Sequence, residues 1–599
     1  MYDPTNPLIV QSDKTVLLEV NNPRYEVARD ALARFAVLEK SPEHIHTYRI
    51  TPLSLWNAAA AGMDAPAIVD ALEKYGKYDL AGNVRADIAD YVSRYGRVKL
   101  IKVDDELRLV SDDASLLTEI VHHKRLAPLV KGRYLDGSLI VDPAQRGPVK
   151  QALIQFGFPA EDLAGYVSGA ALEIQLREQG FYTDTPFALR HYQQEAADIF
   201  YAAGSARGGS GVIVLPCGAG KTMVGLGIMA ELQCHTLILT PSIVAARQWM
   251  REIVDKTGVP EDQIGEYSGE RKEIRPITVT TYQVLTYRPN RKAEFPHFAL
   301  FNEHDWGLII YDEVHLLPAP VFRVTADIQA RRRLGLTATL VREDGHETDV
   351  FSLIGPKKYD VPWKDLEQQG WIATAECHEL RLRLVEERRL EYAIAEEREK
   401  YRIAAENPAK LPAIDELVAK HRDDQVLVIG QYLDQLDEVA ERLQAPLISG
   451  KTPTLDREKL YDAFRTGDIR LLVVSKVANF AIDLPDANVA IQISGTFGSR
   501  QEEAQRLGRI LRPKADGLLA HFYSLVTRDT RDQEFAANRQ MFLTEQGYRY
   551  EILYEDELAA YQPVRRATAA TPGEPVGGDE QQEAQHANVL QFPRRRVAG

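Results

Sequence analysis

The sequence has few cysteines, no long apolar run and no excess of positive charge. Cys217, Cys234 and Cys377 are its only cysteines in 599 residues, too few and too scattered for a disulfide framework or a cysteine zinc motif. No apolar run reaches the roughly 20 residues that a membrane-spanning helix needs, and the first residues lack the pattern of a signal peptide. We therefore expect a protein of a reducing, cytoplasmic compartment with no membrane partner.

The formal net charge is −15, which argues against a protein that coats nucleic acid through its bulk charge. A local basic groove remains open, because counterion release depends on the residues along the binding path. At about 100–200 residues per domain, the length predicts three or more domains.

The most informative stretch is a glycine-containing turn between an expected strand, residues 211–215, and an expected helix, residues 223–232. Backbone N–H groups of such a turn, together with a helix N-terminus, attract phosphate. Lys221 can reach the β- and γ-phosphates, and the Thr222 hydroxyl can bind Mg²⁺. Leu215 takes the place of the usual first glycine, so a strand–turn–helix without a nucleotide is the alternative. The turn consists of Pro216, Cys217, Gly218, Ala219, Gly220, Lys221 and Thr222.

Four further apolar runs alternate with helical segments and predict a doubly wound parallel sheet. Such sheets bind ligands at the carboxyl ends of their strands. The phosphate turn, Asp312-Glu313-Val314-His315 and Thr337-Ala338-Thr339 each follow a strand directly, so we expect them to meet at one edge. The four strands are expected at residues 236–240, 277–282, 308–311 and 333–336.

The residues after the third of these strands suit phosphoryl chemistry. Asp312 is placed to hold Mg²⁺, and Glu313 to orient and deprotonate an attacking water. Two surface carboxylates in a turn would be the alternative if Lys221 and Thr222 were absent. His315 lies near the expected position of Thr337 and Thr339 and could relay the nucleotide state to that loop.

A second series of strands predicts another sheet of the same type between residues 425 and 526. It carries Gln505-Arg506-Leu507-Gly508-Arg509-Ile510-Leu511-Arg512, in which Arg509 and Arg512 share one helix face. Arginines that reach across a domain interface neutralise charge on a transferred phosphoryl group. Hydrolysis would then depend on closure between the two domains.

Two smaller α+β units are expected before the first sheet domain. Residues 1–121 contain helices, one of them started by Thr51-Pro52, and a hairpin around Asp104-Asp105. This order is typical of a winged helix that docks on DNA or on a partner protein. Residues 122–186 are locally basic, which fits either a phosphate-backbone contact or a solvated charged face. The basic residues are His123, Lys124, Arg125, Lys131, Arg133, Arg146 and Lys150.

Two segments fall outside the sheet pattern. Residues 366–412 interrupt it with a charge-laced helical stretch, and residues 561–599 have the composition of a disordered tail that ends in three arginines. The predicted units are therefore 1–121, 122–186, 187–365, 366–412, 413–560 and 561–599.

The motifs together resemble those of superfamily 2 helicases, and more narrowly of XPB-type DNA repair helicases, over about residues 187–550. The resemblance to the superfamily rests on Leu189-Arg190-His191-Tyr192-Gln193, the phosphate turn, 312–315, 337–339 and 505–512. The XPB-type features are Arg342-Glu343-Asp344, 449–453, 475–477 and 482–485.

The resemblance implies an α/β fold with two RecA-like parallel-sheet domains and a thumb-like helical insertion, residues 366–412, between them. It also implies an ATP- and Mg²⁺-dependent 3′–5′ DNA helicase or double-strand translocase of excision repair or promoter opening. Forked or damaged duplex DNA would be the substrate, and a nuclease or other repair protein a partner. The two N-terminal units would be the family's N-terminal and damage-recognition domains.

The resemblance also assigns roles to individual residues. Arg190 and Gln193 would contact adenine. The implied DNA contacts are Arg342, Glu343, Asp344, Thr240 and Thr281, and the implied catalytic set is Lys221, Asp312, Glu313, Gln505, Arg509 and Arg512.

Two other functions remain open from the sequence. One is a translocase without strand separation, such as a restriction-type motor or a remodeller. The other is a nucleotide-gated architectural subunit whose slow ATPase fixes its conformation on a partner.

Overall fold

The computed structural model describes residues 2–290, 293–302, 304–329, 331–340, 347–475, 487–495, 503, 506–508, 510 and 519–564. Six of the predicted site residues lie outside this part of the chain, namely Arg342, Glu343, Asp344, Gln505, Arg509 and Arg512. In the part that is described, no helix is both long and apolar enough to cross a membrane.

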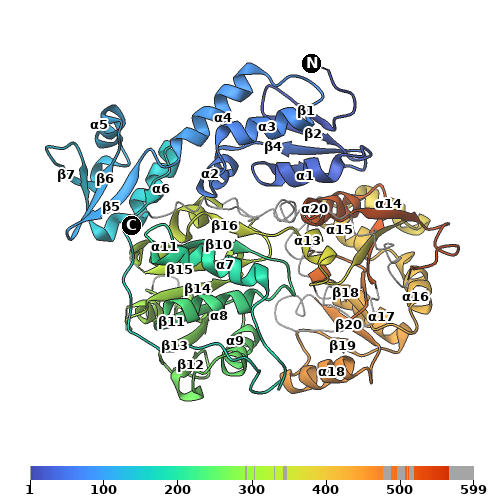
Figure 1. Ribbon diagram of the computed structural model, residues 1–599. Coiled ribbons are helices and arrows are strands. Elements are labelled where there is room, and N and C mark those ends of the chain that lie inside the picture. The colour runs from blue at the N-terminus through green and yellow to red at the C-terminus, as the bar shows by residue number, and fades with distance from the viewer. Residues whose placement is uncertain are drawn as a thin grey trace, which may run out of the picture.

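Lobe 1 is built on a seven-stranded parallel sheet in the order β12-β13-β11-β14-β15-β10-β16. Helices cover the sheet, and α8 follows β10 directly (Figure 1). The strands are β10 (Ser210–Val214), β11 (Thr236–Thr240), β12 (Ile264–Tyr267), β13 (Ile277–Thr281), β14 (Leu308–Asp312), β15 (Arg332–Thr337) and β16 (Lys357–Asp360). The main helices are α7 (His191–Tyr201), α8 (Lys221–Leu232), α9 (Ile243–Lys256) and α11 (Ala319–Asp327).

Lobe 2 is built on a second seven-stranded parallel sheet in the order β19-β20-β18-β21-β22-β17-β23. The expectation of two parallel-sheet domains is therefore confirmed. The strands are β17 (Ala375–Leu382), β18 (Val426–Gly430), β19 (Leu447–Ile448), β20 (Leu471–Ser475), β21 (Val489–Gln492), β22 (Ala520–Thr527) and β23 (Tyr550–Tyr554). The main helices are α16 (Lys410–Lys420), α17 (Leu433–Leu443), α18 (Thr454–Thr466) and α20 (Arg531–Glu545).

The prediction that residues 366–412 form a separate insertion is wrong for residues 375–382. These residues form β17, which lies inside the second sheet between β22 and β23. Polar residues interrupt the apolar pattern that would mark β17 as a buried strand. Hydrogen bonds compensate their burial: Glu379 accepts from Gln540 at 2.6 Å and from Arg381 at 2.6 Å. The helical stretch that follows is two helices, α14 (Glu386–Ile394) and α15 (Glu397–Ala405).

The two N-terminal units divide at a different point from the predicted one. The hairpin expected as a wing of the first unit pairs instead with β8 and β9 of the second, in the sheet order β7-β8-β6-β5-β9. The strands of this second unit are β5 (Lys99–Val103), β6 (Glu106–Val110), β7 (Val130–Arg133), β8 (Leu139–Val141) and β9 (Glu161–Asp162), and its helices are α5 (Ala114–His122) and α6 (Arg146–Phe156).

The first unit has an antiparallel sheet in the order β1-β2-β4-β3. Thr51 caps α2 as its sequence predicts, and its hydroxyl accepts from the Ser54 N–H. The strands are β1 (Leu8–Val10), β2 (Thr15–Glu19), β3 (Val37–Lys40) and β4 (Ile45–Arg49), and the helices are α1 (Tyr25–Ala33), α2 (Pro52–Ala60), α3 (Ala65–Tyr75) and α4 (Gly82–Arg94).

The first unit lies across both lobes (Figure 1). On lobe 1, the Lys357 N–H donates to the Asn57 side-chain oxygen at 3.0 Å. On lobe 2, the Leu38 N–H donates to Glu545 at 3.0 Å, and Met541 of α20 joins the core of the first unit. The relative placement of the lobes is thus linked to the N-terminal sheet.

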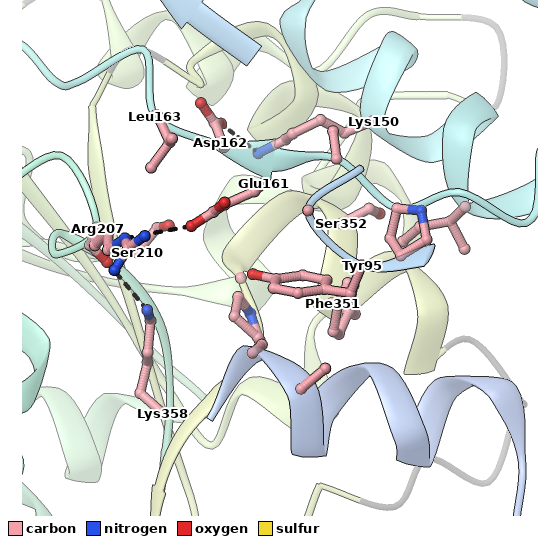
Figure 2. Close-up of a pocket in the computed structure, with 18 of the residues that line it drawn as sticks. Tyr95, Lys150, Glu161, Asp162, Leu163, Arg207, Ser210, Phe351, Ser352 and Lys358 are labelled. Atoms are coloured by element: carbon pink, nitrogen blue, oxygen red, sulfur yellow. Dashed lines mark hydrogen bonds and ion pairs between the residues drawn. The ribbon is translucent and has the colours of Figure 1, made fainter. Parts of the chain in front are cut away.

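The second unit meets lobe 1 around a cavity of about 330 Å³, which Figure 2 shows. Two of its expected basic surface residues, Arg146 and Lys150, are buried here because both pair with Asp162, at 2.7 and 3.0 Å. Burial lowers the pKa of Lys150 to about 7, although the charge of Asp162 opposes that shift. These two basic side chains therefore pair inside the second unit and do not form part of an exposed DNA-binding face.

Candidate active site

The phosphate turn has the backbone that close contact with phosphate requires. Gly218 and Gly220 adopt φ values of +82° and +79°, in the left-handed region where a side chain is strained. Gly220 also begins α8 as its N-cap. A Cβ atom there would lie 2.5 Å from Nε2 of Gln193, so only glycine fits.

The start of α7 supports this turn from behind. Nε2 of Gln193 and the hydroxyl of Tyr192 both donate to the Ala219 carbonyl, each at 2.8 Å. Oε1 of Gln193 accepts from the Arg190 N–H at 2.9 Å, which fixes the amide orientation. Arg190 and Gln193 therefore lie directly beside the turn, and their contact with adenine stays a prediction.

The predicted carboxylates meet the phosphate-turn lysine at the carboxyl edge of the sheet. Nζ of Lys221 lies 3.2 Å from Oε1 of Glu313. Burial and the neighbouring charge of Glu313 raise the pKa of Asp312 to about 6. Burial also disfavours the charged form of Glu313, but the charges of Lys221 and His315 outweigh it and hold the Glu313 pKa below its usual range. The site therefore has two adjacent, half-buried carboxylates and one lysine.

The predicted relay residues form a continuous chain. Nδ1 of His315 lies 3.4 Å from Oε2 of Glu313 and 2.7 Å from the Thr337 hydroxyl. That hydroxyl donates its proton to the Thr339 carbonyl at 2.6 Å, so the imidazole must be the donor to Thr337. A change in the contacts of Glu313 can therefore be passed through His315 and Thr337 to the loop after β15.

Two tryptophans belong to the site although no motif in the sequence points to them. Nε1 of Trp249, on α9, donates to Oδ2 of Asp312 at 3.0 Å. Trp371 lies under the guanidinium of Arg190, at 4.6 Å from ring centroid to carbon. Trp249 reads in the sequence as an ordinary core residue of an amphipathic helix, which is why sequence reasoning missed it.

A segment of lobe 2 touches the phosphate turn. A Cβ atom on Gly508 would lie 2.1 Å from Cβ of Cys217. Leu507 and Ile510 share a buried cluster with Ala219. Arg506 turns away from the turn and donates to Gln492 of β21. The predicted residues Gln505, Arg509 and Arg512 flank this contact in sequence but lie outside the described part of the chain.

The two threonines predicted to contact DNA end neighbouring strands at the same edge. The Thr240 hydroxyl donates to the Thr280 carbonyl at 3.1 Å. The Thr281 hydroxyl accepts from the Val284 N–H at 3.2 Å and caps α10 (Tyr282–Leu285). Both side chains are buried, so any direct hydroxyl contact with DNA stays a prediction.

Comparison with known proteins decides the family. A DNA 3′-5′ helicase XPB from Mycobacterium tuberculosis is 59% identical over 92% of this chain and 98% of its own length. The chain belongs to the XPB family. A DNA 3′-5′ helicase XPB from Kineococcus radiotolerans is 57% identical over 92% of this chain and 97% of its own. A putative DNA 3′-5′ helicase Rad25 from Halobacterium salinarum is 39% identical over 73% and 68%.

Three family descriptions match separate parts of this XPB-family chain. "ERCC3/RAD25/XPB C-terminal helicase" matches residues 366–571, "Type III restriction enzyme, res subunit" matches 186–342, and "Helicase conserved C-terminal domain" matches 8–134. The XPB C-terminal match begins before β17, in agreement with the place of that strand in lobe 2. The XPB-type resemblance read from the motifs is confirmed.

Proposed function

We propose that this XPB-family chain is an ATP-dependent DNA 3′–5′ helicase that opens forked or damaged duplex DNA during repair, beside a nuclease or other repair protein. Its relatives' names support the activity and polarity. The observation that carries the motor mechanism is the contact between Gly508 of lobe 2 and Cys217 of the phosphate turn. A nucleotide held by that turn would lie where the two lobes meet.

The residues at the turn fit ATP with Mg²⁺. Gly218 and Gly220 give the open backbone that phosphates need. Thr222 and Asp312 offer the oxygen donors that Mg²⁺ prefers, and a bound cation would relieve the repulsion between Asp312 and Glu313. When bound, the ion supplies charge neutralisation on the phosphate oxygens.

The ion pair between Lys221 and Glu313 suggests why Glu313 acts as a base only after the nucleotide has bound. At 3.2 Å, the lysine compensates the carboxylate that would deprotonate the attacking water. An arriving γ-phosphate competes for Nζ and leaves Glu313 available to act as the general base. His315 and Thr337 would then pass the change to the loop after β15.

Arg509 and Arg512 are proposed to complete the site from lobe 2, with Gln505 beside them. Their support is the neighbouring Gly508, which already meets the phosphate turn. Because arginine fingers where measured contribute on the order of 10³–10⁵ in rate, hydrolysis would require lobe closure. We propose that the DNA junction is contacted by Arg342, Glu343 and Asp344. Thr240 and Thr281 would lie at the edge of the lobe 1 sheet that faces the DNA strand.

The test compares Lys221→Ala with Lys459→Ala, whose side chain is 79% exposed on lobe 2. Removal of Nζ should lower DNA-stimulated ATP hydrolysis about 100-fold or more and abolish displacement of a forked duplex, whereas Lys459→Ala should match the wild type. Hydrolysis that persists in Lys221→Ala would contradict the phosphate-turn assignment.

Two outcomes with the wild type would favour the alternatives. ATP hydrolysis that DNA does not stimulate indicates the nucleotide-gated architectural subunit. DNA-stimulated hydrolysis that displaces a triplex-forming strand but never separates a fork indicates the translocase.

A further inference from the structure

Lobe 2 contains a buried histidine pair that takes no part in the proposed helicase chemistry. His378 lies on β17 and His521 on the neighbouring β22, and they are 1% and 2% exposed. Glu376 stands opposite His521 in the strand register. Because residues two apart on a strand share a face, Glu376 and His378 point to the same side of the sheet.

These three side chains have the spacing of a metal site. One ligand atom from each lies within 4.8 Å of the other two. Oε2 of Glu376 is 3.8 Å from Nε2 of His378 and 3.9 Å from Nδ1 of His521. Zinc bonds of about 2.1 Å in a tetrahedron place ligand atoms about 3.4 Å apart. The two Glu376 distances would therefore shorten by about half an ångström, and the separation of the two histidine ligand atoms, which is at most 4.8 Å, by up to about 1.4 Å.

Each imidazole also has an acceptor oxygen close to the ring nitrogen that would not bind the ion. Nε2 of His521 lies 3.0 Å from the Val564 carbonyl, which can only accept, so Nε2 carries the hydrogen and Nδ1 is left as a ligand atom. Nδ1 of His378 lies 3.2 Å from the Glu551 carboxylate, which leaves Nε2 toward Glu376. Such acceptors behind metal-binding histidines select the tautomer and raise the ligand basicity.

We propose that Glu376, His378 and His521 bind one divalent transition-metal ion of the zinc type, with water as the remaining ligand. Two imidazoles and a carboxylate suit zinc and do not suit Mg²⁺ or Ca²⁺, which take oxygen ligands. The ion would tie β17 to β22 and, through Val564, fix the segment that follows β23.

The Tyr561 hydroxyl competes for one of the ligand atoms. It lies 3.1 Å from Nε2 of His378 and must leave that nitrogen when an ion binds. Tyr561→Phe therefore removes a competitor while every ligand stays in place. The proposal predicts that this substitution tightens metal binding, an outcome that a purely structural role for the cluster would not give.

The test measures zinc content and affinity in the tag-free, full-length chain. We expect about one equivalent of Zn²⁺ by elemental analysis, and visible d–d absorption of a four-coordinate ion after Co²⁺ substitution. Glu376→Gln, at a partly exposed position, and His521→Asn should weaken Zn²⁺ affinity at least about tenfold, as measured against a competing chelator. His122→Asn, an exposed histidine on α5, is the control and should bind as the wild type does.

The proposal fails if the wild type takes up no Zn²⁺ at micromolar concentration. It also fails if Glu376→Gln binds Zn²⁺ as tightly as His122→Asn does. If His521→Asn does not fold, the opposite shifts expected for Glu376→Gln and Tyr561→Phe still decide the question. None of these readouts depends on helicase activity.

Discussion

At the scale of single residues, Asp312 depends on a hydrogen bond that no motif contains. The carboxylate lies beside Glu313 in a buried setting that raises its pKa to about 6. The indole N–H of Trp249 donates to Oδ2 of Asp312 at 3.0 Å. This hydrogen bond favours the ionised form of Asp312 and orients the carboxylate that would bind Mg²⁺. Trp249 is therefore a positioning residue for the proposed metal ligand.

Trp249→Phe should weaken Mg²⁺-dependent hydrolysis while most of the packing stays in place. A hydrogen bond to a charged group contributes about 1.5–3 kcal/mol, so we expect kcat/KM for ATP to fall at least tenfold. The Mg²⁺ concentration for half-maximal rate should rise, because Asp312 then spends more time protonated. Steady-state ATPase assays over a Mg²⁺ titration measure both effects.

Trp306→Phe is the matched control for this substitution. Trp306 is also buried in lobe 1, and its indole N–H donates to the Leu300 carbonyl at 2.8 Å. Both substitutions remove one buried hydrogen bond, but only one of these bonds reaches the site. An equal shift of the Mg²⁺ midpoint in the two variants would mean that Trp249 acts through stability alone.

At the scale of elements, the sequence predicts strands well where apolar β-branched residues dominate. β10, β14 and β15 are such strands, and their carboxyl ends bring Lys221, Glu313 and Thr337 to one edge as expected. β17 was not predicted because its polar residues interrupt the apolar pattern, and one partner that satisfies them, Gln540, lies far away in the sequence. The role of Trp249 was not predicted because its partner Asp312, the last residue of β14, is also distant in the sequence.

Pairing between strands is also invisible in local patterns. The β5–β6 hairpin was predicted correctly as a hairpin, yet nothing within it shows that its partners are β8 and β9. The contact between Gly508 and Cys217 could not be predicted from local patterns either, because it arises from the packing of the two lobes and not from either motif. Such contacts need the folded arrangement.

The buried His46 on β4 predicts a pH dependence. His46 on β4 lies 3.1 Å from the Tyr25 hydroxyl. Burial, with the charges of Arg549 and Arg29, lowers the pKa of His46 to about 4. The folded pKa lies below the unfolded value of about 6.5, so the unfolded chain binds the proton more readily. Stability is therefore unaffected above pH 6.5 and falls as the pH drops from 6.5 toward 4.

The loss should reach about 2 kcal/mol by pH 5, at about 1.4 kcal/mol per pKa unit. Scanning calorimetry at pH 7.5 and pH 5 checks this value by comparing the wild type with His46→Gln, which cannot take up the proton. His44→Gln, at an exposed position on the same unit, should keep the wild-type pH dependence. If His46→Gln loses as much stability on acidification as the wild type does, His46 is not the group responsible.

At the scale of the whole molecule, several contacts between described residues link the two lobes. The first unit holds lobe 1 through Asn57 and lobe 2 through Glu545, and Gly508 closes directly on the phosphate turn. The first unit therefore links the two lobes at a place separate from the phosphate turn. The Gly508 contact is the part of the interface that forms when lobe 2 closes on the phosphate turn of lobe 1.

Gly508→Ala should separate nucleotide binding from hydrolysis. The new Cβ would lie 2.1 Å from Cβ of Cys217, so the lobes or the turn must move. Because a misplacement of about 1 Å can cost about 100-fold in rate, we expect a fall of that order in the kcat of DNA-stimulated hydrolysis. The affinity for a fluorescent ATP analogue should change much less, since the turn itself belongs to lobe 1.

The control for that substitution is Gly269→Ala, which adds a methyl group to lobe 1 where nothing lies within 4 Å, and it should leave kcat unchanged. Cys217→Gly removes the opposing Cβ, so adding it to Gly508→Ala should restore part of the lost rate if steric exclusion is the cause. Non-additivity between the two substitutions is then the measure of contact across the seam. Wild-type turnover in Gly508→Ala, or strict additivity in the double variant, would show that hydrolysis does not require the lobes to meet at this point.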